Sequence, residues 1–161
     1  MADHVWTQIT IGGAIDREGV DALIEALFDD FHGYDQTPDE VVLEAIRKNE
    51  QFIFQGQCSG DPDITVAVCQ ARGLTYSFCF DSHPEWNAGG KYWTPGLATP
   101  EEFSCASSFH PVLHLKEIRE RLADGSLARH LDDLEIWAGE KGFPVLMLSQ
   151  DLAGEAHAAS S

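Results

Sequence analysis

Apolar and polar residues alternate over residues 5–11, which predicts a half-buried strand that ends at Gly12-Gly13. In the longer segment that follows, the apolar residues are spaced as in a helix. Its N-terminal cap is expected at Asp16 and its end near Gly33. The apolar residues recur at steps of three and four and form one stripe: Val20, Leu23, Ile24, Leu27, Phe28 and Phe31. This is the strongest helix signal in the chain.

A second helix is predicted to begin after Thr37, because Thr37 and Glu40 form a capping box and Pro38 suits the first helical turn. It is expected to end near Lys48. Three strand candidates follow, expected as an antiparallel meander: residues 52–57, 64–68 and 74–80.

Residues 81–110 show little periodicity and contain three prolines and several aromatic residues. We expect a long ordered loop here, since loops of this length in compact domains usually have a function. Two helices are predicted after it, marked by apolar residues over 112–122 and 127–137. The apolar run 143–148 predicts a buried final strand.

The predicted order is therefore β-α-α-β-β-β-α-α-β. Helices around an antiparallel meander favour an α+β fold, a two-layer sandwich with a mostly antiparallel sheet and helices packed on it. With 161 residues, the chain suits one domain, expected over 1–152, followed by a flexible tail at 153–161. No apolar run is long enough to span a membrane and no secretory signal is evident, so we expect a cytoplasmic protein. The four cysteines are then expected to be buried thiols.

The net charge says more about the function of this chain than any sequence motif does. The chain has 27 acidic and 10 basic residues, a net charge of −17. Residues 1–65 hold 14 of the acidic residues and only three basic ones. Such a field repels nucleic acids and anionic membranes, so direct binding to either is excluded.

The first predicted helix carries a row of carboxylates opposite its apolar stripe, and the second helix and the residues around it add more. No lysine or arginine lies three or four residues from Glu25 or Asp29 to neutralise them, although Arg17 lies four residues before Asp21. A row of unpaired carboxylates resembles a nucleic-acid backbone in its charge spacing. The candidate partner-binding acids are Glu18, Asp21, Glu25, Asp29, Asp30, Asp39, Glu40 and Glu44.

Three aromatic residues of the 81–110 segment, Trp86, Tyr92 and Trp93, are added to this candidate surface. Tryptophan and tyrosine are enriched at the energetic centres of protein interfaces. They are also common at the ends of a core, and that alternative stays open.

Other chemistry has weaker support. Cys105 with His110 and His114 supplies a thiol and imidazoles, but no catalytic motif accompanies them. The spacing of the two histidines would suit a metal on a helix, but Pro111 makes His110 a helix cap instead. No phosphate-binding loop is present. We therefore expect no cofactor, no metal and no catalytic residue.

The sequence favours a non-enzymatic acidic interaction protein that inhibits or regulates a nucleic-acid-binding protein or complex with a groove lined by Lys and Arg. Small acidic proteins of phages and plasmids that block such machinery, of the anti-CRISPR or anti-restriction kind, share this composition, although no motif connects them to this chain. The alternative is a small enzyme or ligand-binding domain that uses the 81–114 loop with Cys105, His110 and His114. A third hypothesis is a structural subunit or immunity-type partner whose acidity only confers solubility.

Overall fold

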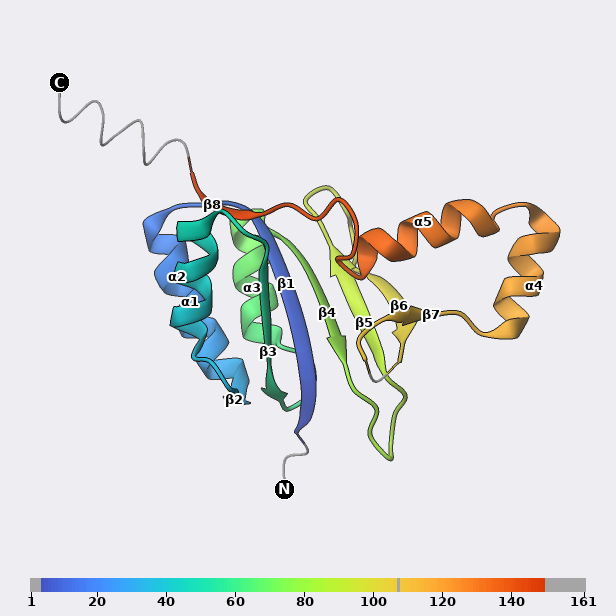
Figure 1. The fold of residues 1–161 in the computed structure, drawn as a ribbon, viewed down its shortest axis with the longest axis horizontal. Coiled ribbons are helices and arrows are strands. Elements are labelled where there is room, and N and C mark those ends of the chain that lie inside the picture. Colours follow the sequence, from blue (N-terminus) through green and yellow to red (C-terminus); the bar gives the residue numbers. More distant parts are fainter. Residues whose placement is uncertain (1–3, 107, 150–161) are drawn as a thin grey trace.

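The computed structural model describes residues 4–106 and 108–149, and it has the predicted α+β fold (Figure 1). The helices are α1 (Arg17–Asp30), α2 (Pro38–Lys48), α3 (Asp63–Arg72), α4 (Leu115–Asp124) and α5 (Leu127–Trp137). The strands are β1 (Val5–Ile15), β2 (Phe31–Gly33), β3 (Phe52–Cys58), β4 (Thr75–Phe80), β5 (Gly89–Trp93), β6 (Glu101–Cys105), β7 (Pro111–Val112) and β8 (Leu146–Leu148). No helix in the described ranges is long and apolar enough to cross a membrane.

The strands form one mostly antiparallel sheet in the order β2-β3-β1-β4-β5-β6-β7. Its centre is a split β-α-β unit, because β3 and β4 are joined through α3 and lie on either side of β1, antiparallel to it. Ile9 of β1 lies opposite Phe54 of β3 and Phe78 of β4. The remaining strands continue from β4 as a meander toward the far edge.

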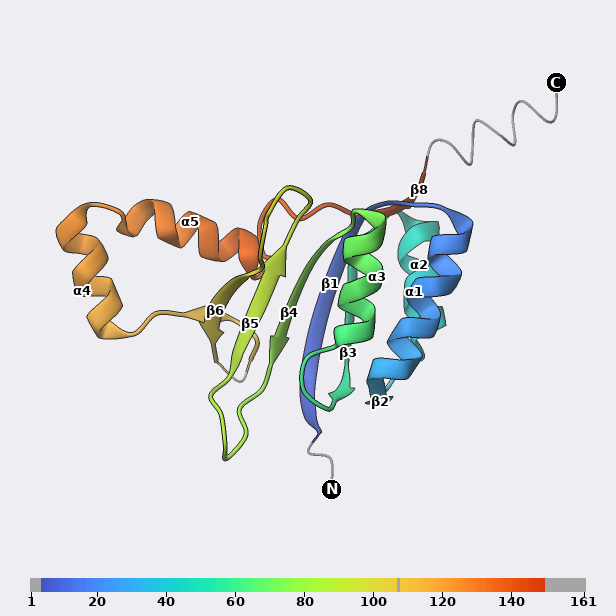
Figure 2. The same ribbon diagram turned by 180° about the vertical axis from the view of Figure 1, so that it is seen from behind.

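The main hydrophobic core lies between one face of this sheet and the layer of α1, α2 and α3. Ile9, Phe54 and Phe78 point into it, together with Leu23 and Leu27 of α1. All five side chains are at most 2% exposed. Figure 2 shows α3 lying over the strands of this face, beside α1.

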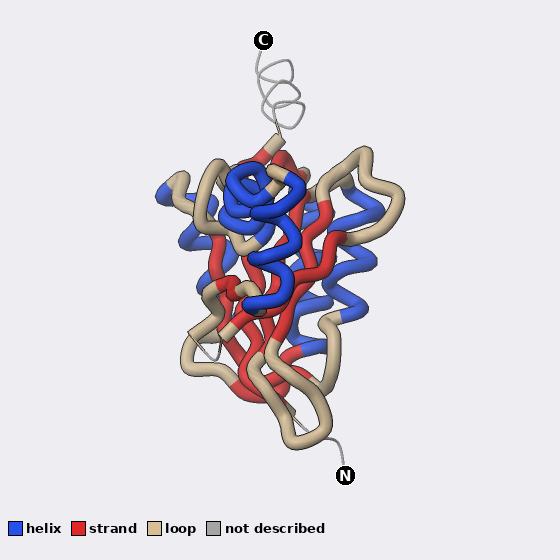
Figure 3. Tube along the Cα trace, turned by 90° about the vertical axis from the view of Figure 1, so that its right-hand side faces the viewer, coloured by secondary structure: helices blue, strands red, loops and turns tan. Residues whose placement is uncertain are grey.

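Near β5 and β6, α5 packs against the sheet through a separate group of buried residues. Here Cys79, Phe103 and Leu134 form a second, smaller core with Cys105. Figure 3 views the molecule from the side of the C-terminal helices. The hydroxyl of Ser77 donates to the backbone carbonyl of Trp137, which fixes the C-terminal end of α5 against β4. The other end of α5 and all of α4 project away from the sheet as an arm (Figure 1).

Beyond the arm the chain returns to the first strand. The end of β1 pairs in parallel with β8, with Gly13 opposite Leu146. A Cβ atom at Gly12 would lie 1.9 Å from the backbone oxygen of Pro144, so only glycine permits this approach. The predicted turn at Gly12-Gly13 is therefore wrong, since β1 continues to Ile15.

The structure corrects the strand predicted at 64–68, which is the helix α3. The carboxylate of Asp30 accepts hydrogen bonds from the backbone N–H and the hydroxyl of Thr65, at 2.6 and 2.7 Å. A residue 35 positions earlier thus caps the first turn of α3. Local sequence could not show this, because the apolar run 64–68 suits a strand as well as a buried helix.

The predicted loop at 81–110 contains β5 and β6. These strands were missed because β5 begins with Gly89-Gly90, which have low strand propensity. Both glycines are buried, and a Cβ at Gly90 would lie 2.3 Å from the backbone oxygen of Phe78. The close approach of neighbouring groups explains glycines at positions where propensity predicts a loop.

Both C-terminal helices are confirmed. The packing of these helices differs from the prediction, because Leu115 and Leu122 of α4 are 64% and 68% exposed and Leu131 of α5 is 45% exposed. The final strand is present but covers only Leu146–Leu148, and it is buried only in part, since Met147 and Leu148 are exposed. The four cysteines are buried free thiols, as predicted. The expected tail at 153–161 lies outside the described residues.

Candidate functional site

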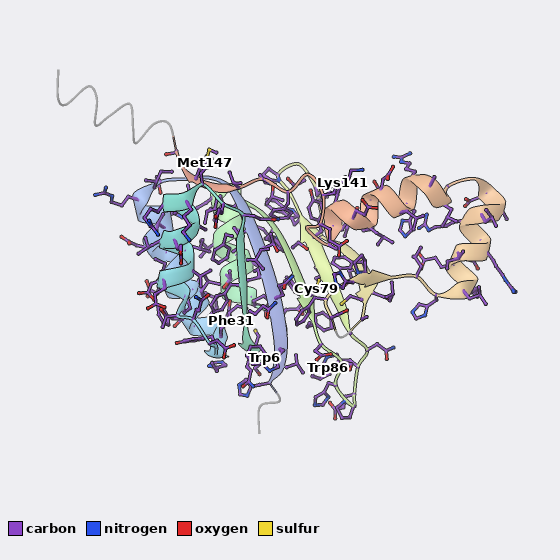
Figure 4. All side chains as sticks on the ribbon, viewed as in Figure 1. Trp6, Phe31, Cys79, Trp86, Lys141 and Met147 are labelled. Carbon is purple, nitrogen blue, oxygen red and sulfur yellow. The ribbon has the colours of Figure 1, made fainter. Side chains whose placement is uncertain are left out.

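Four carboxylates of α1 form a single exposed row on the outer side of the helical layer. Glu18, Asp21, Glu25 and Asp29 are all exposed. At 3.6 residues per turn they fall within an arc of about 80°, opposite the buried stripe. Figure 4 shows oxygen-tipped side chains along the outer side of the α1 and α2 ribbons. We call these four residues the α1 acidic row.

The α1 acidic row is not neutralised by the fold. Among the described residues, none of its members forms an ion pair. By contrast, Glu44 of α2 lies 2.6 Å from the ammonium of Lys48 and 3.8 Å from Arg47. The hydrogen bond from Lys48 lowers the pKa of Glu44. The carboxylates of the α1 acidic row therefore keep a charge that, on Glu44, is partly neutralised by neighbouring cations.

The other predicted acids are placed differently. Glu40 on α2 is exposed and carries no ion pair within the described ranges. Asp39 is half-buried in the first turn of α2. Asp30 is occupied as the cap of α3, and Asp16 caps α1 and lies 3.1 Å from Arg72. Both caps therefore serve the fold.

The three predicted aromatic residues do not gather beside the acidic row. Trp93 and Tyr92 lie on β5, where Trp93 packs on the main core and Tyr92 on the second core. The indole N–H of Trp93 donates to the carbonyl of Leu97 at 3.0 Å. Trp86 stacks on His83 with ring centroids 4.0 Å apart. Figure 4 places Trp86 on the loop between β4 and β5, away from α1 and α2.

An aromatic residue that does flank the row is Phe28, which the sequence assigned to the core stripe. Its side chain is 42% exposed and packs edge-to-face against Tyr34, with centroids 6.1 Å apart. Phe28 directly precedes Asp29, at the border between the acidic and apolar sides of α1. One feature of the sequence indicated that Phe28 is exposed, namely its position at the margin of the apolar stripe.

The spacing of the row limits what it can imitate. From Glu18 to Asp29 the helix rises about 16 Å, over which the row presents four charges. One strand of a duplex carries about five phosphates over that length, and both strands about ten. The α1 acidic row alone therefore approaches the charge density of one strand and falls well below that of a duplex.

The thiol and imidazoles considered for catalysis point to different surroundings. The thiol of Cys105 is buried and donates to the carbonyl of Gly89 at 3.3 Å. A hydrogen bond from Cys79 lowers the pKa of Cys105, and the same contact raises that of Cys79. His110 is exposed and its Nδ1 lies 2.7 Å from Glu140, while His114 is the N-cap residue of α4. Within the described ranges, no hydrogen bond or ion pair joins the side chains of Cys105, His110 and His114.

A polar cleft of about 460 Å³ lies between the sheet and the arm. Three of its lining side chains are connected, because Glu117 of α4 lies 3.3 Å from His130 of α5 and 3.4 Å from Arg121. His130 is 7% exposed and packs edge-to-face on Trp137. This network ties α4 to α5. No group of three potential metal ligands occurs in the part of the chain described.

No family model, curated protein or solved structure matches this chain. A function for this protein therefore has to be inferred from its own residues and their arrangement.

Proposed function

We propose that this chain is a non-enzymatic interaction protein that binds a basic, nucleic-acid-binding protein and inhibits or regulates it through the α1 acidic row. The observation that supports this most is the row itself, four exposed carboxylates on one side of a rigid helix without ion pairs in the described structure. An ordinary solvated helix usually carries both signs of charge. The partner we propose has a groove that holds one nucleic-acid strand between lysines and arginines.

The helical layer gives the row a firm base. Val20, Leu23 and Leu27 on the opposite side of α1 are at most 6% exposed, so the helix is held against the sheet. Carboxylates on a fixed helix lose little freedom when they bind, which favours affinity. Long-range attraction by an acidic surface also speeds encounter with a basic partner.

In this proposal, Phe28 and Tyr34 supply an apolar contact with the partner, which the carboxylates cannot provide. Exposed ion pairs contribute little to affinity, whereas aromatic groups that become buried at an interface contribute strongly. In this proposal the acidic row orients the partner, and the Phe28 ring becomes buried beside it.

A charge-reversal experiment tests the proposal. The protein is used to capture partners from the source cells, with wild type compared with an Asp21→Lys, Glu25→Lys, Asp29→Lys variant. A matched variant, Glu50→Lys, Glu85→Lys, Glu102→Lys, makes the same change in net charge away from α1. We expect nucleic-acid-binding proteins to be captured by wild type and the matched variant, and lost with the α1 variant.

Two further conditions sharpen the readout. Captured partners should be released by a single-stranded oligonucleotide, because both ligands would compete for one groove. Capture should also fall steeply as salt rises from about 50 to about 500 mM, since exposed charges are screened. Equal loss with both triple variants would mean that net charge matters and the α1 row does not. Capture unaffected by the α1 variant would overturn the proposal.

A further inference from the structure

The α4–α5 arm exposes apolar side chains that a water-soluble helix would normally bury. Among the described residues, α4 has no buried side chain. Leu115 and Leu122 are seven residues apart, so they lie on one face of α4, two turns apart, and both are more than 60% exposed. A helix of 10 residues is only marginally stable in water without tertiary packing.

An apolar groove continues this surface between the two helices. It has a volume of about 450 Å³, and its lining is apolar apart from Glu135: Pro111, Val112, Leu113, Ile118, Leu127, Leu131 and Leu134. Leu131 is 45% exposed and Val112 38% exposed, although they lie in the groove. Glu117 of α4 lies 3.3 Å from His130 of α5, and this polar contact joins the two helices while Leu115, Leu122 and Leu131 stay exposed.

The charge of the arm indicates which partner can cover it. Residues 111–137, which include both helices of the arm, carry four basic and six acidic residues, whereas residues 1–65 carry three basic and 14 acidic ones. A protein of net charge −17 repels its own copies over most of its surface. The arm has a smaller excess of acidic residues than residues 1–65, so two copies can meet there with less of that repulsion.

The position of the arm adds to this argument. It leaves the sheet at the β6–β7 edge, and the helical layer lies toward the β2 edge (Figures 1 and 2). Six strand spacings of about 4.8 Å separate the two edges, about 29 Å in all. This exceeds three Debye lengths at physiological salt, so the acidic layers of two copies joined at their arms would be screened from each other.

We propose that the α4–α5 arm is a self-association surface that joins two copies of this chain by a twofold contact. Leu115 and Leu122 of each copy would pack against the groove of the other. A twofold contact uses the same patch on both copies and closes at two. This inference is independent of the proposed partner of the α1 acidic row.

The size of the arm predicts a reversible dimer. Two helices about 15 Å long and about 10 Å wide present a footprint of about 300 Å². Stable interfaces bury about 800 Å² on each partner. The dimer should therefore form and dissociate with concentration, while a permanent complex would need more surface.

Sedimentation velocity on the full chain tests the proposal, over concentrations from about 5 to about 500 µM, the range in which a weak dimer dissociates. Wild type is compared with a Leu115→Gln, Leu122→Gln variant, in which glutamine keeps helix propensity while it removes the apolar contact. The matched control is Leu43→Gln, Ile64→Gln, since these residues of α2 and α3 are 53% and 48% exposed. Circular dichroism verifies that each variant is folded.

We expect a dimer fraction that rises with concentration in wild type and in the control, and self-association at least about tenfold weaker in the arm variant. Higher salt should leave the dimer intact or strengthen it, because it screens acidic repulsion. Binding through the α1 row should weaken under the same conditions, so the two proposals can fail separately. A monomer at all concentrations, or a dimer equally stable in the arm variant, would overturn the inference.

Discussion

The helical layer of α1, α2 and α3 and the arm of α4 and α5 are both attached to the same sheet, but they are packed in opposite ways. In the layer, helix side chains such as Leu23 and Leu27 are completely buried against strand residues such as Phe54. In the arm, α5 inserts Leu134 into a small core, whereas α4 has no buried side chain in the described structure. One region is stabilised within the chain, and the other leaves apolar surface for a second copy.

The same contrast holds for charge. The layer has a dense apolar inner side and exposes an acidic row on its outer side, where ion pairs are few. The arm carries four basic and six acidic residues, and Arg121 pairs with Glu117 there at 3.4 Å. The difference teaches that net charge alone does not locate an interaction surface, because the more acidic and the less acidic ends of one molecule suit different partners.

The largest effect is expected on the free energy of unfolding, when a leucine of the layer and a leucine of the arm are each replaced by alanine. Leu27→Ala should reduce the free energy of unfolding by about 2–5 kcal/mol, since it leaves a cavity in a completely buried site. Leu122→Ala should change it by less than about 0.5 kcal/mol in the monomer, because this side chain is 68% exposed. Urea unfolding at low protein concentration measures both. Equal losses would show that the arm is packed as tightly as the layer.

The next effect concerns neighbouring aspartates with different surroundings. Asp30→Ala should cost about 1–2 kcal/mol, because it removes the cap of α3 and the hydrogen bonds to Thr65. Asp29→Ala, one residue earlier in the acidic row, should leave stability nearly unchanged. Thermal unfolding of the two variants provides the comparison. If Asp29→Ala destabilised the protein as much, the row would have a structural role and its availability to a partner would be in doubt.

A smaller effect at moderately alkaline pH should come from a thiol of the main core. Burial raises the pKa of Cys58 from 9.0 to about 12. A group whose pKa is higher in the folded state stabilises the protein fully below its unfolded pKa, so stability should fall as pH rises from about 9 toward 12. At pH 10 the loss is at most about 1.4 kcal/mol. Urea unfolding at pH 8, 9 and 10 measures it, and Cys58→Ala should make the slope shallower, while Cys69 and Cys79, whose pKa is also raised, keep their contributions. An unchanged slope in that variant would assign the loss to another group.

Much of the fold could be predicted from the sequence. The stripe at Val20, Leu23 and Leu27 determined α1, because helical spacing over three turns leaves few alternatives. Alternation over residues 75–80 determined β4 in the same way. The helix at 63–72 and the strands at 89–93 and 101–105 were missed, since their stability depends on the cap from Asp30 and on close packing around Gly90.

The candidate surface was predictable only in part. The spacing of Glu18, Asp21, Glu25 and Asp29 already placed them on one side of a helix. The sequence could not show which residues lie next to a candidate side chain in space. Asp30 caps α3 and Trp93 packs on the main core because of such distant neighbours. The exposure of Phe28 also depends on where the neighbouring elements end.

By itself, the sequence determined the local patterns: a helix with an apolar and an acidic side, an alternating strand, and a net charge concentrated in residues 1–65. These follow from residue spacing, which a helix or strand converts directly into faces. The tertiary structure alone decided which apolar residues are covered. Leu27 and Leu122 look alike in sequence, and they differ because the sheet lies under one and solvent over the other. Burial depends on distant contacts, and no local pattern contains them.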